Sequence, residues 1–267
     1  MPDKFRILFL GDVIGRPGRQ ALDLILPRLI KKHSPAVVIA NGENAAGGIG
    51  ITAEICEEML QKVDILTSGN HIWDKKDAIP HLDNEPRLLR PANYPPRNPG
   101  RGMYVLEKWN GLRVGVLNLQ GRVFMEPVDC PFRTADELLL KMRVETPVII
   151  VDFHAEATSE KQALGWYLDG RVSAVIGSHT HVPTADERIL PHGTAYLTDV
   201  GMVGGYDSVI GIKKEEAIQR FLTARPQRFE PAKGSLVVSA VCVEIDAKTG
   251  RALEIEREFW VEKDVCR

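Results

Sequence analysis

Short apolar runs alternate with longer segments of helical pattern in the first part of the chain. The runs at residues 5–10, 36–40 and 63–67 are rich in Val, Ile and Leu, and glycine or polar residues follow each of them. Between the first two, residues 21–30 repeat apolar side chains at helical spacing, and Pro17 suits the first turn of a helix. Strands that alternate with helices predict βαβ units and a largely parallel sheet.

Later segments predict antiparallel strands and therefore a second sheet. Asn110-Gly111 separates the apolar segments 103–109 and 112–119, which is a strong hairpin pattern. Further strands are expected at residues 147–151, 171–176, 194–197, 236–245 and 252–261, and further helices at 53–62 after a Thr52 cap, 134–143 after a Thr134 cap, 159–168 and 213–221. The Pro-rich interval 86–99 predicts an ordered surface loop. The sequence thus predicts one α/β domain over residues 1–267 with two mixed β-sheets.

Composition limits the function classes. The chain has 267 residues, 44% hydrophobic and 26% charged, with a formal net charge of −2, which is typical of a globular protein. We expect neither a nucleic-acid clamp nor a membrane partner, because there is no block of like charges, no apolar signal segment and no run long enough to span a bilayer. Four scattered cysteines, Cys56, Cys130, Cys242 and Cys266, predict reduced thiols in a cytoplasmic protein.

Polar groups gather where predicted strands end. His179 and His181 follow the strand at 171–176, and in an extended chain residues i and i+2 point to the same side. Other strand ends carry potential oxygen and nitrogen ligands, namely Asp12, Glu43, Asn44, Asn70, His71 and His154. Each alone has an ordinary interpretation as a helix cap, a turn former or a buried structural histidine. Together they exceed the ligands that one ion needs, and they suit borderline metals such as Mn, Fe, Co, Ni or Zn.

The residues allow a division between two ions. Glu43 would bridge them, with Asp12 and His181 on one ion. Asn70, His154 and His179 would serve the other.

The same blocks resemble a known superfamily. Gly11-Asp12, residues 69–71, His154 and residues 177–181 resemble the motifs of the calcineurin-like metallophosphoesterases. Residues 41–48 and 152–161 are similar to the YmdB-like branch, whose members are described as cyclic-nucleotide phosphodiesterases. The resemblance implies an α/β/β/α sandwich of two mixed sheets flanked by helices, with a dinuclear metal centre.

The chain departs from the broad superfamily at two ligands. Many members carry Asp-x-His in the first block, whereas this chain has Asp12-Val13-Ile14, and Glu43 stands where a bridging aspartate is usual. Similarity to the YmdB-like branch implies that Asn44 takes the place of the missing histidine. It also implies that His71 stabilises the transition state or protonates the leaving oxygen, and Asp74 is near enough in sequence to orient it.

These features predict hydrolysis of a small phosphodiester, either a 2′,3′- or a 3′,5′-cyclic nucleotide. Two bound ions, with Fe or Mn favoured and Zn, Co, Ni or Mg as alternatives, would lower the pKa of a shared water so that hydroxide attacks phosphorus. The alternatives are a phosphomonoesterase, nucleotidase or nuclease on the same core, or a metal-bearing regulatory protein with little turnover. A nuclease is disfavoured because charge is near neutral and aromatic residues are only 6%.

Two glycine-rich stretches have less specific interpretations. Residues 47–50 suit either a backbone nest for phosphate or tight packing beside the metals. Residues 201–208 predict a mobile loop that could border the substrate pocket. The sequence leaves self-association into a homo-oligomer open.

Overall fold

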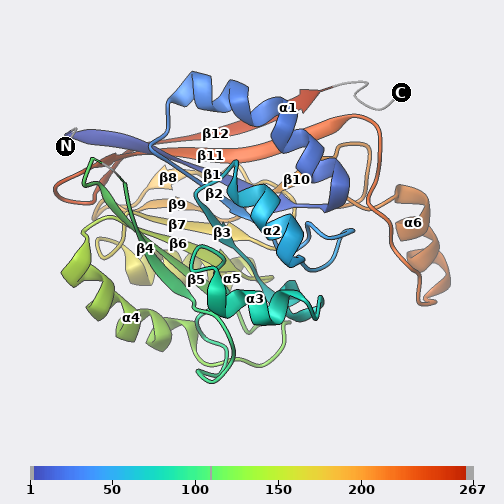
Figure 1. Cartoon of the computed structure of the whole chain (residues 1–267), viewed down its shortest axis with the longest axis horizontal. Coiled ribbons are helices and arrows are strands. Elements are labelled where there is room, and N and C mark those ends of the chain that lie inside the picture. The colour runs from blue at the N-terminus through green and yellow to red at the C-terminus, as the bar shows by residue number, and fades with distance from the viewer. Residues whose placement is uncertain (1–2, 109, 263–267) are drawn as a thin grey trace.

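Two six-stranded mixed sheets pack face to face, with helices on both outer faces (Figure 1). The computed structural model describes residues 3–108 and 110–262. The predicted α/β/β/α class is therefore confirmed. Predictions that fall on Met1, Pro2, Trp109 and Cys266 lie outside the described residues.

The first sheet brings the first strand of the chain next to strands from its last third. Its strand order is β12 (Ala252–Glu262), β11 (Leu236–Asp246), β10 (Met202–Gly205), β1 (Lys4–Val13), β2 (Val37–Asn41) and β3 (Ile65–Thr67). β1 changes partner along its length. Residues from Lys4 to Leu10 pair with antiparallel β11, whereas Asp12 and Val13 pair with parallel β10. The change occurs at Gly11, where a Cβ would lie 2.1 Å from Gly201 O, so only glycine allows this close approach.

The second sheet is parallel in its centre and antiparallel at both edges. Its order is β4 (Met103–Glu107), β5 (Arg113–Gln120), β6 (Ile149–His154), β7 (Ala174–Ser178), β9 (Ala195–Leu197) and β8 (Arg188–Ile189). β5, β6, β7 and β9 run parallel. The β4–β5 pair is the predicted hairpin, and Gly111 in its turn has φ +78°. The carboxyl ends of β5, β6 and β7 therefore share one edge of this sheet.

Helices cover the outer face of each sheet. The helices are α1 (Gly15–His33) and α2 (Ala53–Leu60) over the first sheet, α4 (Pro131–Glu145) and α5 (Thr158–Leu168) over the second, and the shorter η1 (Asn70–Trp73), α3 (Ala78–Asn84) and α6 (Lys214–Thr223). α6 lies at the periphery in Figure 1. None of the helices in the described residues has the length and the low charge of a membrane-spanning helix.

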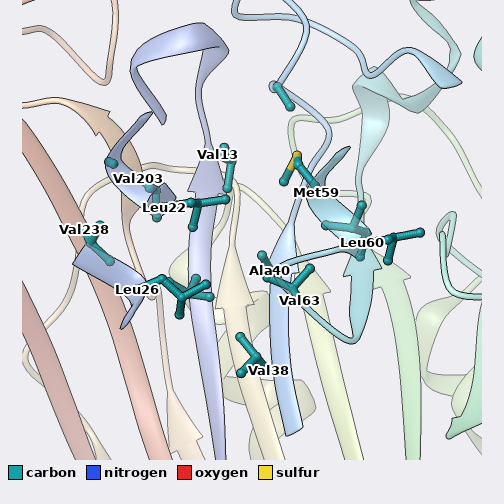
Figure 2. Close-up of a cluster of buried hydrophobic side chains, with 14 of the residues drawn as sticks. Val13, Leu22, Leu26, Val38, Ala40, Met59, Leu60, Val63, Val203 and Val238 are labelled. Carbon is teal, nitrogen blue, oxygen red and sulfur yellow. The ribbon is translucent and has the colours of Figure 1, made fainter. Parts of the chain in front are cut away.

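The apolar core has three layers, and β1 contributes to two of them. Leu8 and Leu10 belong to the cluster that also contains buried residues of α1 and α2. Figure 2 shows Leu22, Leu26 and Val38 of this cluster. Ile7 and Phe9, at the alternate positions, point into the layer between the two sheets. A third layer joins the second sheet to α4 and α5. The period of two along β1 thus fixes both packing faces.

Several local predictions are confirmed. Pro17 lies in the first turn of α1, and Thr52 caps α2 by accepting a hydrogen bond from Ile55 N at 3.2 Å. Residues 86–99 form an ordered loop, held to β3 by a bridge between Leu66 and Leu88.

Two local predictions are wrong. Thr134 does not cap α4, because the helix begins at Pro131, whose fixed φ suits the first helical position. Residues 201–208 are not simply a mobile loop. Met202–Gly205 forms β10, which is buried between β1 and β11 over most of its length.

Candidate metal centre

All eight predicted site residues lie at one edge of the two sheets. Asp12 lies near the end of β1, and Glu43 and Asn44 follow β2. Asn70 and His71 begin η1 after β3, His154 ends β6, and His179 and His181 follow β7. Each of them contacts at least one other member of the set. The carboxyl ends of strands from both sheets therefore meet here, as expected for an α/β sheet.

Glu43 and His154 are the centre of one group of ligand atoms. His154 Nε2 lies 3.0 Å from Glu43 Oε1, 3.0 Å from His179 Nδ1 and 3.2 Å from Asn70 Oδ1. Glu43, His154 and His179 each offer one ligand atom, and these atoms lie within 4.8 Å of one another. That spacing suits three ligands of a single ion.

A second group lies on the other side of Glu43. His181 Nε2 is 3.9 Å from Asp12 Oδ2 and 3.3 Å from the amide of Asn44. The Asn44 amide also lies 3.4 Å from Glu43 Oε1, which links the two groups. A half-turn of this amide exchanges its nitrogen for its oxygen, and the oxygen is a metal ligand.

Each of the three histidines in these groups has its second ring nitrogen directed at an acceptor. The acceptors are Ser178 Oγ for His154 at 3.0 Å, Glu156 Oε2 for His179 at 3.1 Å, and Ile210 O for His181 at 2.9 Å. When that nitrogen carries the proton, the nitrogen that faces the other site residues presents a lone pair. Metal-binding histidines in proteins generally have this arrangement.

The two buried carboxylates create a demand for positive charge. Asp12 and Glu43 are both fully buried, and Asp12 Oδ1 has no hydrogen-bond partner among the described residues. Burial raises the pKa of Asp12. Burial acts in the same direction on Glu43, but the charges and hydrogen bonds of His154 and His71 together outweigh it and lower the pKa of Glu43 to about 2.

The histidines show the same balance. Burial would lower the pKa of His154, but the negative charges of Glu43 and Asp12 outweigh it and raise that pKa to about 9. Burial and the charge of His154 lower the pKa of His179 to about 3. A site that concentrates buried negative charge, with one carboxylate oxygen unpartnered, fits divalent cations.

His179 and His181 both reach the site, but the prediction that an extended chain places them on the same side is wrong. β7 ends at Ser178, and His179 and His181 have φ of +100° and +65°, so the chain is not extended there. Asp199 holds this turn by accepting a hydrogen bond from Thr180 N at 3.1 Å. The strained φ of His179 is thus maintained by surrounding contacts, as is common at functional sites.

His71 lies beside the two candidate ligand groups but contacts them differently. Its backbone N–H donates to Glu43 Oε2 at 3.0 Å, and its ring Nδ1 lies 2.7 Å from Asp74 Oδ2. The predicted contact with Asp74 is therefore confirmed. With Nδ1 engaged, Nε2 is the ring atom left for a substrate.

A cavity of about 870 Å³ opens onto this edge. One wall carries Glu43, Asn44, His71, His179 and His181, and residues 46–49 of the glycine-rich loop also line it. Its size is near the upper end of the range for small-molecule sites. The candidate ligand groups are therefore accessible to a small molecule in this cavity.

Sequence reasoning missed the residues that support the histidines. Ser178 donates to Asp152 Oδ1 at 2.6 Å, and burial raises the pKa of Asp152 to about 7. Lys161 Nζ forms a buried ion pair with Asp199 at 2.6 Å. Asp152 lies two residues before His154, a position that could have indicated its role. Asp199 follows a predicted strand, as the ligand candidates do.

Comparisons with known proteins agree with this geometry. A family model described as YmdB-like protein matches residues 8–258. A Bacillus subtilis protein named 2′,3′-cyclic-nucleotide 2′-phosphodiesterase is 53% identical over 253 residues, covering 94% of this chain and 96% of its own.

Two crystal structures share the fold. A hypothetical protein from Thermus thermophilus has a TM-score of 0.89 at 44% identity, covering 96% of this chain and 99% of its own. A Mycoplasma pneumoniae protein described as a novel phosphatase has a TM-score of 0.92 at 37% identity, covering 99% of this chain and 96% of its own. The resemblance predicted from the sequence motifs is confirmed: this chain belongs to the YmdB-like protein family.

Proposed function

We propose that this protein is a metal-dependent phosphodiesterase that hydrolyses 2′,3′-cyclic nucleotides. The observation that carries the proposal is the arrangement of His154, His179 and His181 around two buried carboxylates. The second ring nitrogen of each histidine is directed at a hydrogen-bond acceptor. The name of the Bacillus subtilis relative supports the choice of a 2′,3′-cyclic substrate.

We assign the ligands to two ions. Asp12, Asn44 and His181 would hold one ion, Asn70, His154 and His179 the other, and Glu43 both. Fe or Mn is our preferred metal, because carboxylate, amide and imidazole ligands without a thiolate suit these ions. When bound, the ions would supply activated water and neutralise charge on the phosphoryl oxygens.

His71 completes the reaction as the proton donor. Attack of water oxygen on phosphorus forms one P–O bond, and the bond from phosphorus to the 2′ oxygen breaks. His71 Nε2 gives its proton to that leaving oxygen, and the proton that the attacking water releases to solvent restores His71, so the product is a nucleoside 3′-phosphate. Asp74 fixes the orientation of the ring through its contact with Nδ1. Glu43 places the residue by accepting from its backbone N–H.

The proposal is tested with protein purified without chelator. Its metal content is measured first, and then kcat/KM is compared for bis(4-nitrophenyl) phosphate and 4-nitrophenyl phosphate. We expect preference for the diester, and conversion of 2′,3′-cyclic AMP to 3′-AMP with slower hydrolysis of 3′,5′-cyclic AMP. Preference for the monoester would establish a phosphomonoesterase instead, and bound metal without turnover would favour a regulatory protein.

We further propose that residues 1–267 form one domain and that it acts in the cytoplasm. The apolar layer shared by the two sheets supports one domain. The free thiols of Cys56, Cys130 and Cys242 support a reducing compartment.

A further inference from the structure

The cavity has a second wall that the metal centre does not explain. It is built from residues 227–231 together with Ile210 and Ile212. An antiparallel bridge joins Ile212 to Pro231, and Ile210 O accepts the hydrogen bond from His181. The second wall is thus attached directly to a proposed metal ligand.

The glycine-rich loop lies between this wall and Lys75. A Cβ at Gly48 would lie 3.2 Å from Pro231 Cγ, and one at Gly50 would lie 2.7 Å from Lys75 Cγ. The absence of side chains at these two glycines allows both neighbours to approach. Lys75 and residues 227–231 therefore border the same cavity from two sides of one loop.

Phe229 gives the second wall an aromatic surface. Its ring is half-buried and lines the cavity. The guanidinium carbon of Arg220 lies 5.7 Å from the ring centroid, a cation–π contact that supports the ring from α6. A supported aromatic ring at the side of a cavity suits stacking with a nucleobase.

Among the described residues that line the cavity, the carboxylates have charged partners, whereas two of the cations do not. Its carboxylates are engaged: Glu43 in the metal centre, Glu156 with His179 at 3.1 Å, and Glu230 with Lys213. Its cations Lys75 and Arg228 form no ion pair and no side-chain hydrogen bond with the residues that the structure describes. Two cations without partners in a cavity favour an anionic ligand group.

We propose that Arg228 and Lys75 form a subsite for a second phosphate, so that the preferred substrate is a nucleoside 2′,3′-cyclic phosphate that also carries a 5′-phosphate. This inference rests on the proposed function. With the cyclic phosphate at the metals and the base on Phe229, the 5′ position extends from the opposite side of the ribose. A phosphate there reaches toward cations that the reacting phosphate does not need. Arg228 suits this group because its planar guanidinium binds phosphate through two nitrogens.

The experiment compares substrates with and without the 5′-phosphate. Steady-state kcat/KM is measured for 2′,3′-cyclic AMP and for its 5′-phosphorylated form, and calorimetry compares the products 3′-AMP and adenosine 3′,5′-bisphosphate. In the wild type we expect the 5′-phosphate to improve both quantities about tenfold, the size of one charge-assisted hydrogen bond. In Arg228→Gln the ratio of kcat/KM with the 5′-phosphate to kcat/KM without it should fall toward one. It should fall further in the double variant Arg228→Gln with Lys75→Gln.

The chain offers matched controls. Arg225→Gln and Lys76→Gln remove nearby cations that do not line the cavity, and both should keep the wild-type ratio. Equal values for the two substrates in the wild type, or a ratio that survives the double substitution, would overturn the subsite. If neither substrate is hydrolysed, the proposed function fails, and the calorimetry still decides whether the second phosphate is bound.

Discussion

At the scale of single residues, the contacts of each histidine ring separate proposed ligands from the proposed acid. His154, His179 and His181 direct one nitrogen at another site residue and the other at an acceptor outside the two ligand groups. His71 contacts the proposed ligand Glu43 through its backbone, and its ring faces Asp74. A ring in this position can exchange a proton with substrate without holding an ion.

His71→Ala should therefore keep both metals and lose turnover by about two or more orders of magnitude, because the proton donor is removed. Metal content and kcat are measured on the same preparation. His192→Ala is the control, since that ring is exposed and pairs with Asp169 away from the cavity. Loss of metal from His71→Ala in parallel with activity would make His71 a ligand.

Glu43→Gln should lower the content of both metals together. Glu43 Oε1 lies close to His154 and to the Asn44 amide, so one carboxylate serves both groups. Elemental analysis after gel filtration measures the two ions. The control Glu58→Gln removes a carboxylate from the surface of α2 and should keep them. A Glu43→Gln protein with normal metal content and rate would rule out the bridge.

At the scale of elements, the connection between β3 and η1 depends on one residue without a side chain. A Cβ at Gly69 would lie 2.1 Å from His154 Nε2 and 2.1 Å from its Cδ2. Gly69 has φ −150°, outside the left-handed region that favours glycine. The requirement for glycine is therefore the space that the imidazole occupies.

Gly69→Ala should displace His154 and lower metal occupancy, with activity falling in proportion. The added methyl group overlaps a ring that is buried and cannot move freely. Metal titration by calorimetry, together with urea unfolding, measures the effect. In Gly204→Ala the nearest atom to the new Cβ is 3.4 Å away, an ordinary contact. This control should bind metal normally, and equal behaviour of the two variants would contradict the steric argument.

Elements with strong apolar patterns were predictable, and elements set by tertiary contacts were not. β1, β2 and β6 coincide with short runs of apolar residues, many of them β-branched, which favour buried strands. Asn110-Gly111 specifies the turn of the β4–β5 hairpin. β8 has two exposed residues, so nothing in its sequence marks a strand. β10 contains two glycines and exists because β1 and β11 flank it.

The site residues were predictable because they follow buried strands, but their supporting contacts were not. Asp12, Glu43 and His154 could be placed at strand ends from the apolar runs before them. Ser178 and Asp199 act through hydrogen bonds to residues distant in sequence. Such contacts depend on how the two sheets are juxtaposed, which periodicity does not specify.

At the scale of the whole molecule, the site depends on both sheets and on both ends of the chain. The first sheet supplies Asp12 and Glu43, and the second supplies His154 and His179. β1 carries Asp12 and is held between β2 and strands from the last third of the chain, β10 and β11. Whatever fixes the C-terminal strands on this sheet therefore helps to fix the metal centre.

Glu258 is one such group, because it joins β12 to the last turn of α1. Its carboxylate is 4% exposed, lies 2.7 Å from His33 Nε2 and also pairs with Lys32. Burial works to raise its pKa, but hydrogen bonds from Lys32, Trp260 and His33 outweigh burial, and the pKa of Glu258 is lowered below its ordinary 4.5. A carboxyl whose pKa is lower in the folded protein stabilises the fold at pH values above its pKa in the unfolded chain. That stability is lost as the pH falls through its pKa in the folded protein.

Glu258→Gln should therefore reduce the free energy of unfolding by about 2 kcal/mol at neutral pH. The difference from wild type should narrow as the pH falls below the ordinary value of 4.5, because the wild-type carboxyl then also loses its charge. Urea unfolding of both proteins between neutral pH and pH values below 4.5 measures this difference in the free energy of unfolding. Glu256→Gln removes the half-exposed second partner of Lys32 and should change stability little, since exposed ion pairs contribute little. A Glu258→Gln difference that stays constant with pH would show that packing, not charge, holds β12 to α1.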